Sequence, residues 1–202
     1  THIEPAERHA LRGTGFPNFH SEFVDRLNET YPERPNPQQV FYYIYAVLYS
    51  TIYRTRYHSY LVSDFPAVPF TTNYELFIRL SDLGQRLAEI HLMKSGELDR
   101  VNLELQIKPQ YFEQATIDPE PFLSKITEQE WGYVLNGYRV MDKWAVYQTS
   151  RKGNRLTPRE CLRLMRTVEA IRLTISYQEA IDRWYPAIEA DLLADCSHRA
   201  DK

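Results

Sequence analysis

The stretch YELFIRLSDLGQRLAEIHLM, residues 74–93, decides the fold class of this chain. Apolar residues recur in it every three or four positions, at Leu76, Leu80, Leu83, Leu87 and Ile90. This period is typical of an α-helix that buries one face. Just before it, Thr72 and Glu75 have the spacing of a capping box, which closes the first turn of a helix. The sequence therefore predicts a long amphipathic helix that begins after Thr72.

Three more helices are expected upstream. The first covers residues 21–31. The second begins after Asn36, an N-cap residue followed by proline, and it should be buried because apolar residues cover most of its circumference. The third follows Ser50, a second cap residue, and reaches residue 61. The two prolines in DFPAVPF, residues 64–70, end it because proline cannot continue a helix.

The second half of the chain mixes strand and helix patterns. RVNLELQIK, residues 100–108, alternates apolar and polar positions, as a half-buried strand does. WGYVLNGYRVMDKW, residues 131–144, reads as strand, turn and helix, with Asn136-Gly137 as the turn. A second capping box, from Thr157 to Glu160, opens a long helix with one apolar face made of Cys161, Leu164, Val168, Ile171 and Ile175.

These patterns predict an α+β, mainly helical fold, in which long amphipathic helices pack with a small antiparallel strand section near residues 100–140. Residues 1–17 lack periodicity and are expected to be an arm or linker. Residues 18–186 would form a single domain, and residues 187–202, which are polar, a frayed tail. A chain of 202 residues that is 43% hydrophobic is long enough to bury one good core.

The sequence gives little sign of a membrane segment or a disulfide framework. The longest apolar run, residues 40–49, is about half of the roughly 20 residues that a membrane helix needs. The two cysteines, Cys161 and Cys196, are too few for a framework and favour a reducing environment. We therefore expect a cytoplasmic protein without a membrane partner.

Most enzyme motifs are missing. The chain has neither a GxxxxGK[ST] phosphate loop nor a GxGxxG turn. Neither cysteine has a neighbour at metal-ligand spacing, and the histidines at 58, 91 and 198 are far apart. His91 falls on the apolar face of its helix, which favours a structural role, and Glu128 and Glu130 are expected to be solvated. We expect no catalytic residue, no metal and no cofactor in this chain.

The charge is distributed unevenly. The chain carries a net charge of -3, but residues 139–172 contain nine cations and three anions, a net +6, so the remainder carries -9. A basic stripe on an acidic body is typical of a surface that meets phosphates. Arg159, Arg163 and Arg166 share one predicted helix, however, and fit its solvated outer face equally well.

The candidate DNA-binding residues follow from this pattern. Two stretches combine cations with aromatic residues or glycine: YRTRY, residues 53–57, and residues 136–155. We expect phosphate contacts from Arg54, Arg56, Lys143, Arg151, Lys152 and Arg155, with Tyr57 beside Arg54, and base or groove contacts from Arg139 and Asn154. For YRTRY, an intramolecular ion pair with the acidic remainder is the alternative.

Several ordered pieces of the chain resemble one family. VFYYIYAVLYSTIYRTRYHSYLVSDFPAVPF, ELFIRLSDLGQRLAEIHLM, NGYRVMDKW and SRKGNRLT resemble, in this order, the C-terminal specificity domain of Type ISP restriction-modification enzymes and of related helicase-methyltransferase polypeptides. The likeness covers residues 18–181. Where the family usually has a glycine pair, this chain has Asn136-Gly137, and asparagine is the residue next best able to adopt a positive φ.

The resemblance implies a DNA target-recognition domain that grips duplex DNA and supplies sequence specificity but is not itself catalytic. Its partners would be duplex DNA and the methyltransferase and helicase domains of a parent polypeptide that also carries a nuclease. S-adenosylmethionine, ATP and Mg would bind in those other domains. Residues 107–127 match the family least and are a candidate base-reading segment, with Lys108, Gln110 and Gln114. The alternative is a helical docking module within the same multidomain enzyme.

Overall fold

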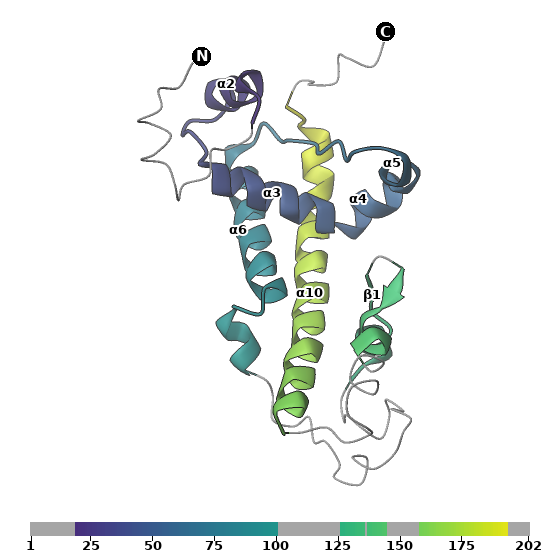
Figure 1. Ribbon diagram of the computed structural model, residues 1–202. Helices are drawn as coiled ribbons and strands as arrows, with labels where there is room; N and C mark the ends of the chain where they lie inside the picture. Colours follow the sequence, from purple (N-terminus) through teal and green to yellow (C-terminus); the bar gives the residue numbers. More distant parts are fainter. Residues whose placement is uncertain (1–18, 101–125, 136, 145–157, 194–202) are drawn as a thin grey trace, which may run out of the picture.

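The computed structural model describes residues 19–100, 126–135, 137–144 and 158–193 (Figure 1). It is mainly helical, with one two-stranded antiparallel sheet, so the predicted fold class is confirmed. The strand expected at residues 100–108 lies outside the described residues, apart from Arg100 at the end of a 3₁₀ turn. No helix in the described ranges is long and apolar enough to cross a membrane.

The first part of the chain forms a helical bundle. In order, its elements are α2 (Ser21–Thr30), α3 (Pro37–Tyr49), α4 (Thr51–Arg56), α5 (His58–Ser63), α6 (Tyr74–His91) and the 3₁₀ helix η1 (Gly96–Arg100). Helix α10 (Pro158–Ala190) runs beside α6, and α3 packs across both of them (Figure 1). At 1.5 Å per residue, the 33 residues of α10 span about 50 Å.

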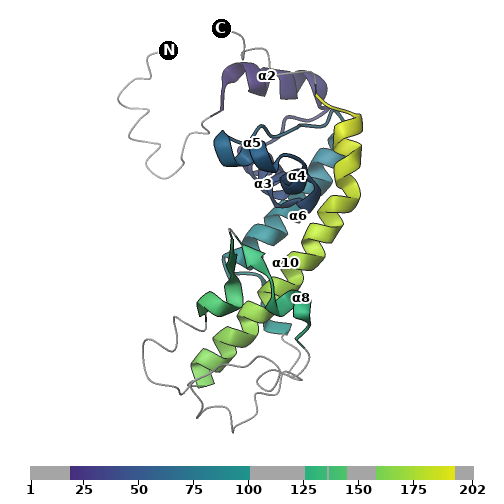
Figure 2. The same ribbon diagram turned by 90° about the vertical axis from the view of Figure 1, so that its right-hand side faces the viewer.

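The remaining described elements form a small unit against α10. It consists of α8 (Glu128–Trp131), β1 (Val134–Leu135), β2 (Tyr138–Arg139) and the helical residues 140–144, and we call it the hairpin module. The predicted turn at residues 136–137 is confirmed, although a short second strand precedes the helix. Figure 2 shows the module in front of α10, below α4 and α5.

Two hydrophobic cores hold these parts together. The bundle core is built around aromatic residues, with Tyr43, Tyr53, Phe77 and Tyr185 almost fully buried. The second core joins the hairpin module to α10 and contains Met141, Leu164, Val168 and Ile171. Because α10 contributes to both cores, it is the spine of the molecule.

Most helix starts follow the sequence. The Asn36 side chain accepts a hydrogen bond from the Gln39 amide, and the Gln39 side chain accepts one from the Asn36 amide, each at 2.8 Å. Ser50 caps α4 as predicted, but the third helix breaks at Tyr57 into α4 and α5. Helix α3 is less buried than expected, since Phe41 on its outer side is exposed.

The predicted cap of α6 was wrong by one residue. Asn73, and not Thr72, caps the helix by accepting a hydrogen bond from the Leu76 amide at 3.0 Å. The hydroxyl of Thr72 instead donates to the carboxylate of Asp191. A tertiary contact therefore takes the side chain that the sequence assigns to the cap.

The start of the predicted frayed tail was also wrong. Pro186 lies inside α10, which continues to Ala190, and Ile188 is fully buried. Residues 191–193 then pair with the segment before α6. The Thr72 amide donates to the Asp191 carbonyl at 3.0 Å, and the Leu193 amide donates to the Phe70 carbonyl at 2.7 Å. These backbone hydrogen bonds and the burial of Ile188 hold the chain in place up to residue 193.

Candidate nucleic-acid interface

The hairpin module is fixed to the amino-terminal half of α10 by apolar packing. Met141 is buried among Leu164, Val168 and Ile171, and the side chains of Ile126, Trp131, Tyr133, Val140 and Trp144 pack around them. Trp144 is therefore part of the packing between the hairpin module and α10.

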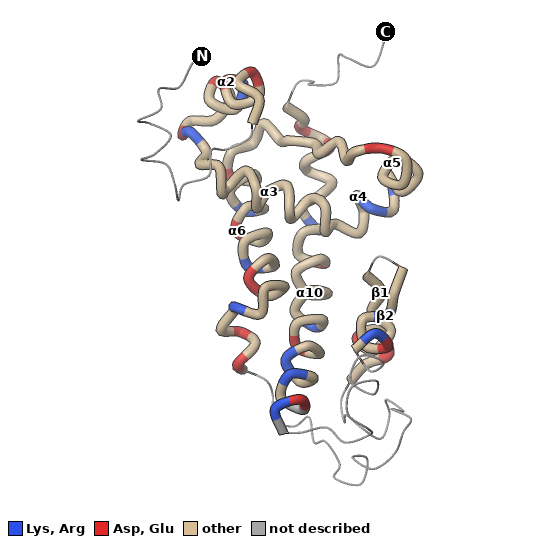
Figure 3. Tube along the Cα trace, in the orientation of Figure 1, with Lys and Arg blue, Asp and Glu red and all other residues tan. Residues whose placement is uncertain are grey.

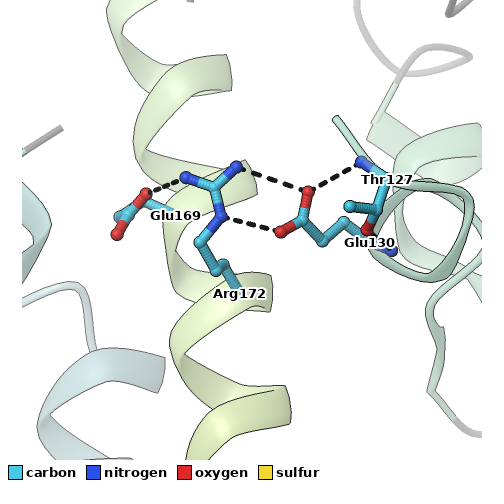
Figure 4. A network of polar contacts seen from close by, with 4 residues as sticks. All are labelled: Thr127, Glu130, Glu169 and Arg172. Carbon is cyan, nitrogen blue, oxygen red and sulfur yellow. Dashed lines mark hydrogen bonds and ion pairs between the residues drawn. The ribbon is translucent and has the colours of Figure 1, made fainter. Parts of the chain in front are cut away.

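A carboxylate clamp strengthens the same contact (Figure 4). Two nitrogens of the Arg172 guanidinium donate to the Glu130 carboxylate at 2.7 and 3.3 Å, and a third donates to Glu169 at 2.9 Å. The Glu130 carboxylate also accepts from the Thr127 amide at 2.9 Å, as one half of a capping box. Glu130 is only 8% exposed, so the expectation of a solvated glutamate was wrong.

The clamp has a clear electrostatic signature. Burial by itself would raise the pKa of the Glu130 carboxyl, but the hydrogen bonds from Arg172 and Thr127 outweigh it and hold that pKa below its ordinary value. The hydrogen bonds to Glu130 likewise raise the pKa of Arg172. Arg172 therefore forms intramolecular ion pairs, and its pair with Glu130 holds α8 against α10.

The hairpin has a defined register. Val134 pairs with Arg139 and Leu135 with Tyr138, so residues 136–137 form a two-residue turn, in which Gly137 has φ of 79°. That positive φ is what hairpin turns of this length require, and glycine adopts it without strain. The Val140 amide donates to the Tyr133 carbonyl at 3.1 Å and continues the pairing into the helix.

The hairpin module exposes two cations, Arg139 and Lys143, and the aromatic ring of Tyr138. Tyr138 is 60% exposed, and the Lys143 ammonium lies 4.0 Å from the centre of its ring. Such a cation–π contact at an exposed site is worth about 0.5–1 kcal/mol, enough to orient both side chains. Arg139 is exposed and forms no ion pair within the described part of the chain.

The arginines of α10 divide into two groups. Arg166 pairs with Asp99 at 3.3 Å and donates to the Met93 carbonyl, so it ties η1 and the end of α6 to α10. Arg159 and Arg163 are exposed and have no ion-pair partner among the described residues. Figure 3 shows Lys and Arg positions gathered on the first turns of α10.

The predicted YRTRY contacts lie on α4, on the same side of α10 as the hairpin (Figures 1 and 2). Arg56 forms an ion pair with Glu189, which is the intramolecular alternative that the sequence left open. Arg54 is half-buried; burial raises the pKa of the Tyr133 hydroxyl, and the Arg54 charge opposes this. Tyr57 is exposed, with its ring centre 5.2 Å from that of Tyr53.

The other predicted contacts, Lys108, Arg151, Lys152, Asn154 and Arg155, lie outside the described residues, and so do Gln110 and Gln114. They remain predictions.

Two polar networks connect α10 to α4, to α3 and to the hairpin module, and they were not predicted from the sequence. Asp182 of α10 accepts hydrogen bonds from the Ser50 hydroxyl at 2.6 Å and the Thr51 amide at 3.0 Å, which fixes α4 to the spine. Gln178 accepts from the Tyr133 hydroxyl at 3.4 Å and donates to the Tyr49 carbonyl at 3.2 Å, which links the hairpin module to α3. Their partners lie more than 40 residues away in sequence, so no local pattern could reveal them.

His91 has the structural role that its position predicted. One ring nitrogen lies 2.6 Å from the Tyr45 hydroxyl and the other 3.0 Å from that of Thr174, so both are hydrogen-bonded. Burial lowers the pKa of the imidazole. His91 therefore joins α3, α6 and α10 as a neutral side chain at pH 7.

Two further observations on the described residues concern metal ligands and a surface depression. No three histidine, cysteine, aspartate or glutamate side chains among them come together as metal ligands. A surface depression of about 570 Å³ follows α6, but Glu75 and Asp82 in it alternate with Arg79 and Arg86 along one helix, and no histidine lines it. Charges of opposite sign on successive turns offset one another.

Comparison with known proteins identifies the family. No curated protein and no solved structure matches the chain. The model of the Type ISP C-terminal specificity domain matches residues 2–160, which is most of the chain. The matched part contains the bundle helices from α2 to α6, the hairpin module and the first turn of α10. This chain therefore belongs to the Type ISP C-terminal specificity domain family.

Proposed function

We propose that this chain binds duplex DNA and gives sequence specificity to a restriction-modification polypeptide. Membership of a specificity-domain family supports a role in target recognition. Adenine methylation, helicase-like translocation and DNA cleavage would belong to other domains of that polypeptide, which would also bind S-adenosylmethionine, ATP and Mg. The domain would work with its methyltransferase and helicase neighbours in the cytoplasm.

The observation that carries the proposal is the separation of charge along α10. Its amino-terminal half, residues 158–175, has four arginines and two glutamates, whereas residues 176–190 have one arginine and three carboxylates. Arg159 and Arg163, at the positive end, are exposed and have no carboxylate partner in the described ranges. Unpaired cations at one end of an acidic body attract a polyanion and orient it toward that end.

The residues divide by role. Lys143, Arg159 and Arg163 would contact phosphates, which fix the register of the domain on DNA without reading sequence. Arg139, on the hairpin, would reach base edges. Arg54, Tyr57 and the three cations at 151, 152 and 155 would extend the phosphate contacts, with Asn154 and Lys108 in a groove. Arg56 would contribute only after leaving Glu189.

Charge reversal tests the proposal. Binding of the full chain to a fluorescent random-sequence duplex is measured by anisotropy. Arg159→Glu with Arg163→Glu should weaken binding at least tenfold, because two phosphate contacts become repulsive. Arg183→Glu is the matched control, since Arg183 is an exposed arginine in the acidic half of the same helix. Equal losses in both variants, or no loss in the double variant, would count against the proposed surface.

A docking role is the second candidate, and one observation favours it. Tyr60 and Val62 on α5 and Phe65 just after it are exposed, Phe65 to 90%. Exposed apolar side chains near one another in sequence are a candidate protein–protein contact. Val62→Asp with Phe65→Asp separates the two roles. If docking is the main function, this variant loses association with the other domains of the polypeptide, while its DNA affinity stays that of the unmodified chain.

A further inference from the structure

The two faces of the hairpin differ, and on one of them, which we call the open face, both side chains are exposed. Residues directly opposite each other in an antiparallel pair lie on the same face, so Leu135 and Tyr138 share one face while Val134 and Arg139 share the other. On the first of these faces Leu135 is half-buried, and the Lys143 ammonium lies over the Tyr138 ring. On the face with Val134 and Arg139 both side chains are exposed, so both are open to a ligand.

The two side chains on the open face have complementary chemistry. Val134 is 50% exposed and ends in two methyl groups, and Arg139 is exposed and ends in a planar fork of N–H donors. The major groove admits a two-stranded β-ribbon. Within that groove, an arginine donates two hydrogen bonds to guanine O6 and N7, and an apolar side chain contacts the C5-methyl group of thymine.

Resting on the DNA-binding function proposed above, we propose that the Val134–Arg139 pair reads a T·A base pair next to a G·C base pair from the major groove. Opposed side chains in a hairpin have their Cβ atoms about 4.5–5.5 Å apart. Base pairs rise by about 3.4 Å, and the longer arginine side chain spans the difference. The pair thus matches two adjacent base pairs and no more.

The hairpin is held rigidly enough to discriminate bases. Its base is tied by the hydrogen bond from the Val140 amide to the Tyr133 carbonyl, and Met141, directly after it, is buried against α10. The Arg172–Glu130 clamp holds α8, which directly precedes the hairpin in sequence, against α10. Lys143, which lies over the Tyr138 ring of the other face, would contact a phosphate at the edge of the groove, so reading and anchoring would come from different faces.

Selection from a pool of duplexes with a randomised central region tests the inference on the full chain. The unmodified chain should enrich a site that contains adjacent T·A and G·C pairs. Arg139→Ala should lower the preference for guanine about fivefold to a hundredfold, and Val134→Ala should lower the preference for thymine about fourfold. Lys143→Ala is the matched control: it should weaken binding to all sequences equally and leave the enriched site unchanged.

Base analogues then identify the contacted atoms. Uracil in place of the selected thymine removes only the methyl group, and 7-deazaguanine removes only N7. The unmodified chain should lose affinity with each analogue, whereas Val134→Ala should no longer respond to uracil and Arg139→Ala no longer to 7-deazaguanine. Thermal unfolding of both variants checks that they are folded.

The outcomes separate the two proposals. If the unmodified chain enriches no site, the specificity function fails and the inference with it. If it enriches a site that Arg139→Ala and Val134→Ala both retain, or one without adjacent T·A and G·C pairs, DNA recognition stands and the reading role of the hairpin is overturned.

Discussion

Replacing Arg172 by alanine should detach the hairpin module from α10. The substitution leaves the Glu130 carboxylate, which is 8% exposed, without its cation. Breaking a fully buried ion pair on one side costs about 3–5 kcal/mol. Because the Arg172 side chain keeps a third of its surface in water, we expect a loss of about 2–3 kcal/mol. This is a large share of the roughly 5–15 kcal/mol that stabilises a typical domain.

Tryptophan fluorescence can localise this loss. Trp131 and Trp144 pack in the core of the hairpin module, whereas Trp184 lies on the other half of α10. In a Trp184→Phe background, fluorescence therefore reports on the module alone. With a urea dependence of about 2 kcal/mol per M, Arg172→Ala should lower the midpoint of the fluorescence transition by about 1 M or more.

The pH dependence gives an independent sign. The pKa of Glu130 in the folded protein is held below its ordinary value, so the clamp stabilises above about pH 4.5, the ordinary carboxyl pKa, and this stability is lost as the pH falls through the folded pKa. Without Arg172 its hydrogen bonds and its charge no longer lower the pKa of Glu130, so that pKa rises from its value in the folded unmodified chain. The variant should therefore lose less stability than the unmodified chain when the pH falls below about 4.5.

Arg163→Ala is the matched control, because Arg163 is an exposed arginine on the same helix. Its removal should change stability by less than about 0.5 kcal/mol. If Arg172→Ala unfolds at the same urea concentration as Arg163→Ala, the clamp does not hold the module.

Two further predictions concern the bundle. Gly84→Ala should lower the unfolding free energy by about 2 kcal/mol or more, because a Cβ atom there would lie 1.9 Å from the Tyr42 carbonyl oxygen. Gly96→Ala is the control, because a Cβ atom at that position has nothing within 4 Å. Equal thermal midpoints of the two variants would contradict the close contact of α3 and α6. Burial lowers the pKa of His91, so the unfolding free energy should fall as the pH drops below about 6.5, where the unfolded chain takes up a proton. His91→Gln should flatten this part of the plot of unfolding free energy against pH, as measured by urea unfolding at each pH. A variant with the same slope against pH as the unmodified chain would refute the assignment.

Local patterns predicted the elements of the fold well. The apolar period of residues 74–93 is that of α6, and the Asn36–Gln39 capping box forms as expected because both partners lie within one turn. The Asn136-Gly137 turn was predictable because a two-residue hairpin loop requires a positive φ, which Gly137 has. In each case the cause lies within a few residues of the effect.

Long-range contacts account for the errors. Thr72 and Asn73 are both able to cap a helix. The Thr72 hydroxyl donates a hydrogen bond to the carboxylate of Asp191, 119 residues away, and Asn73 is left to cap α6. The sequence placed the end of the folded domain at Pro186, because the backbone hydrogen bond between Leu193 and Phe70 leaves no local sequence pattern.

The candidate site shows the same limit. The sequence located the basic stripe but could not tell which cations are free to bind a ligand. Arg166 and Arg172 form ion pairs with Asp99 and Glu130, whereas Arg163, three residues before Arg166 on the same helix, is exposed. Only the Glu169–Arg172 pair, three residues apart on one helix, carried a local signal.

The salt dependence of DNA binding tests the central claim most directly. The three cations assigned to phosphates in the described part of the chain, Lys143, Arg159 and Arg163, should together release about three counterions. Anisotropy titrations of the full chain with random duplex DNA, at several salt concentrations, should therefore give a slope of log affinity against log salt of about -3 or steeper. Binding that is absent at low salt, or a slope near zero, would contradict a DNA-binding role for this domain.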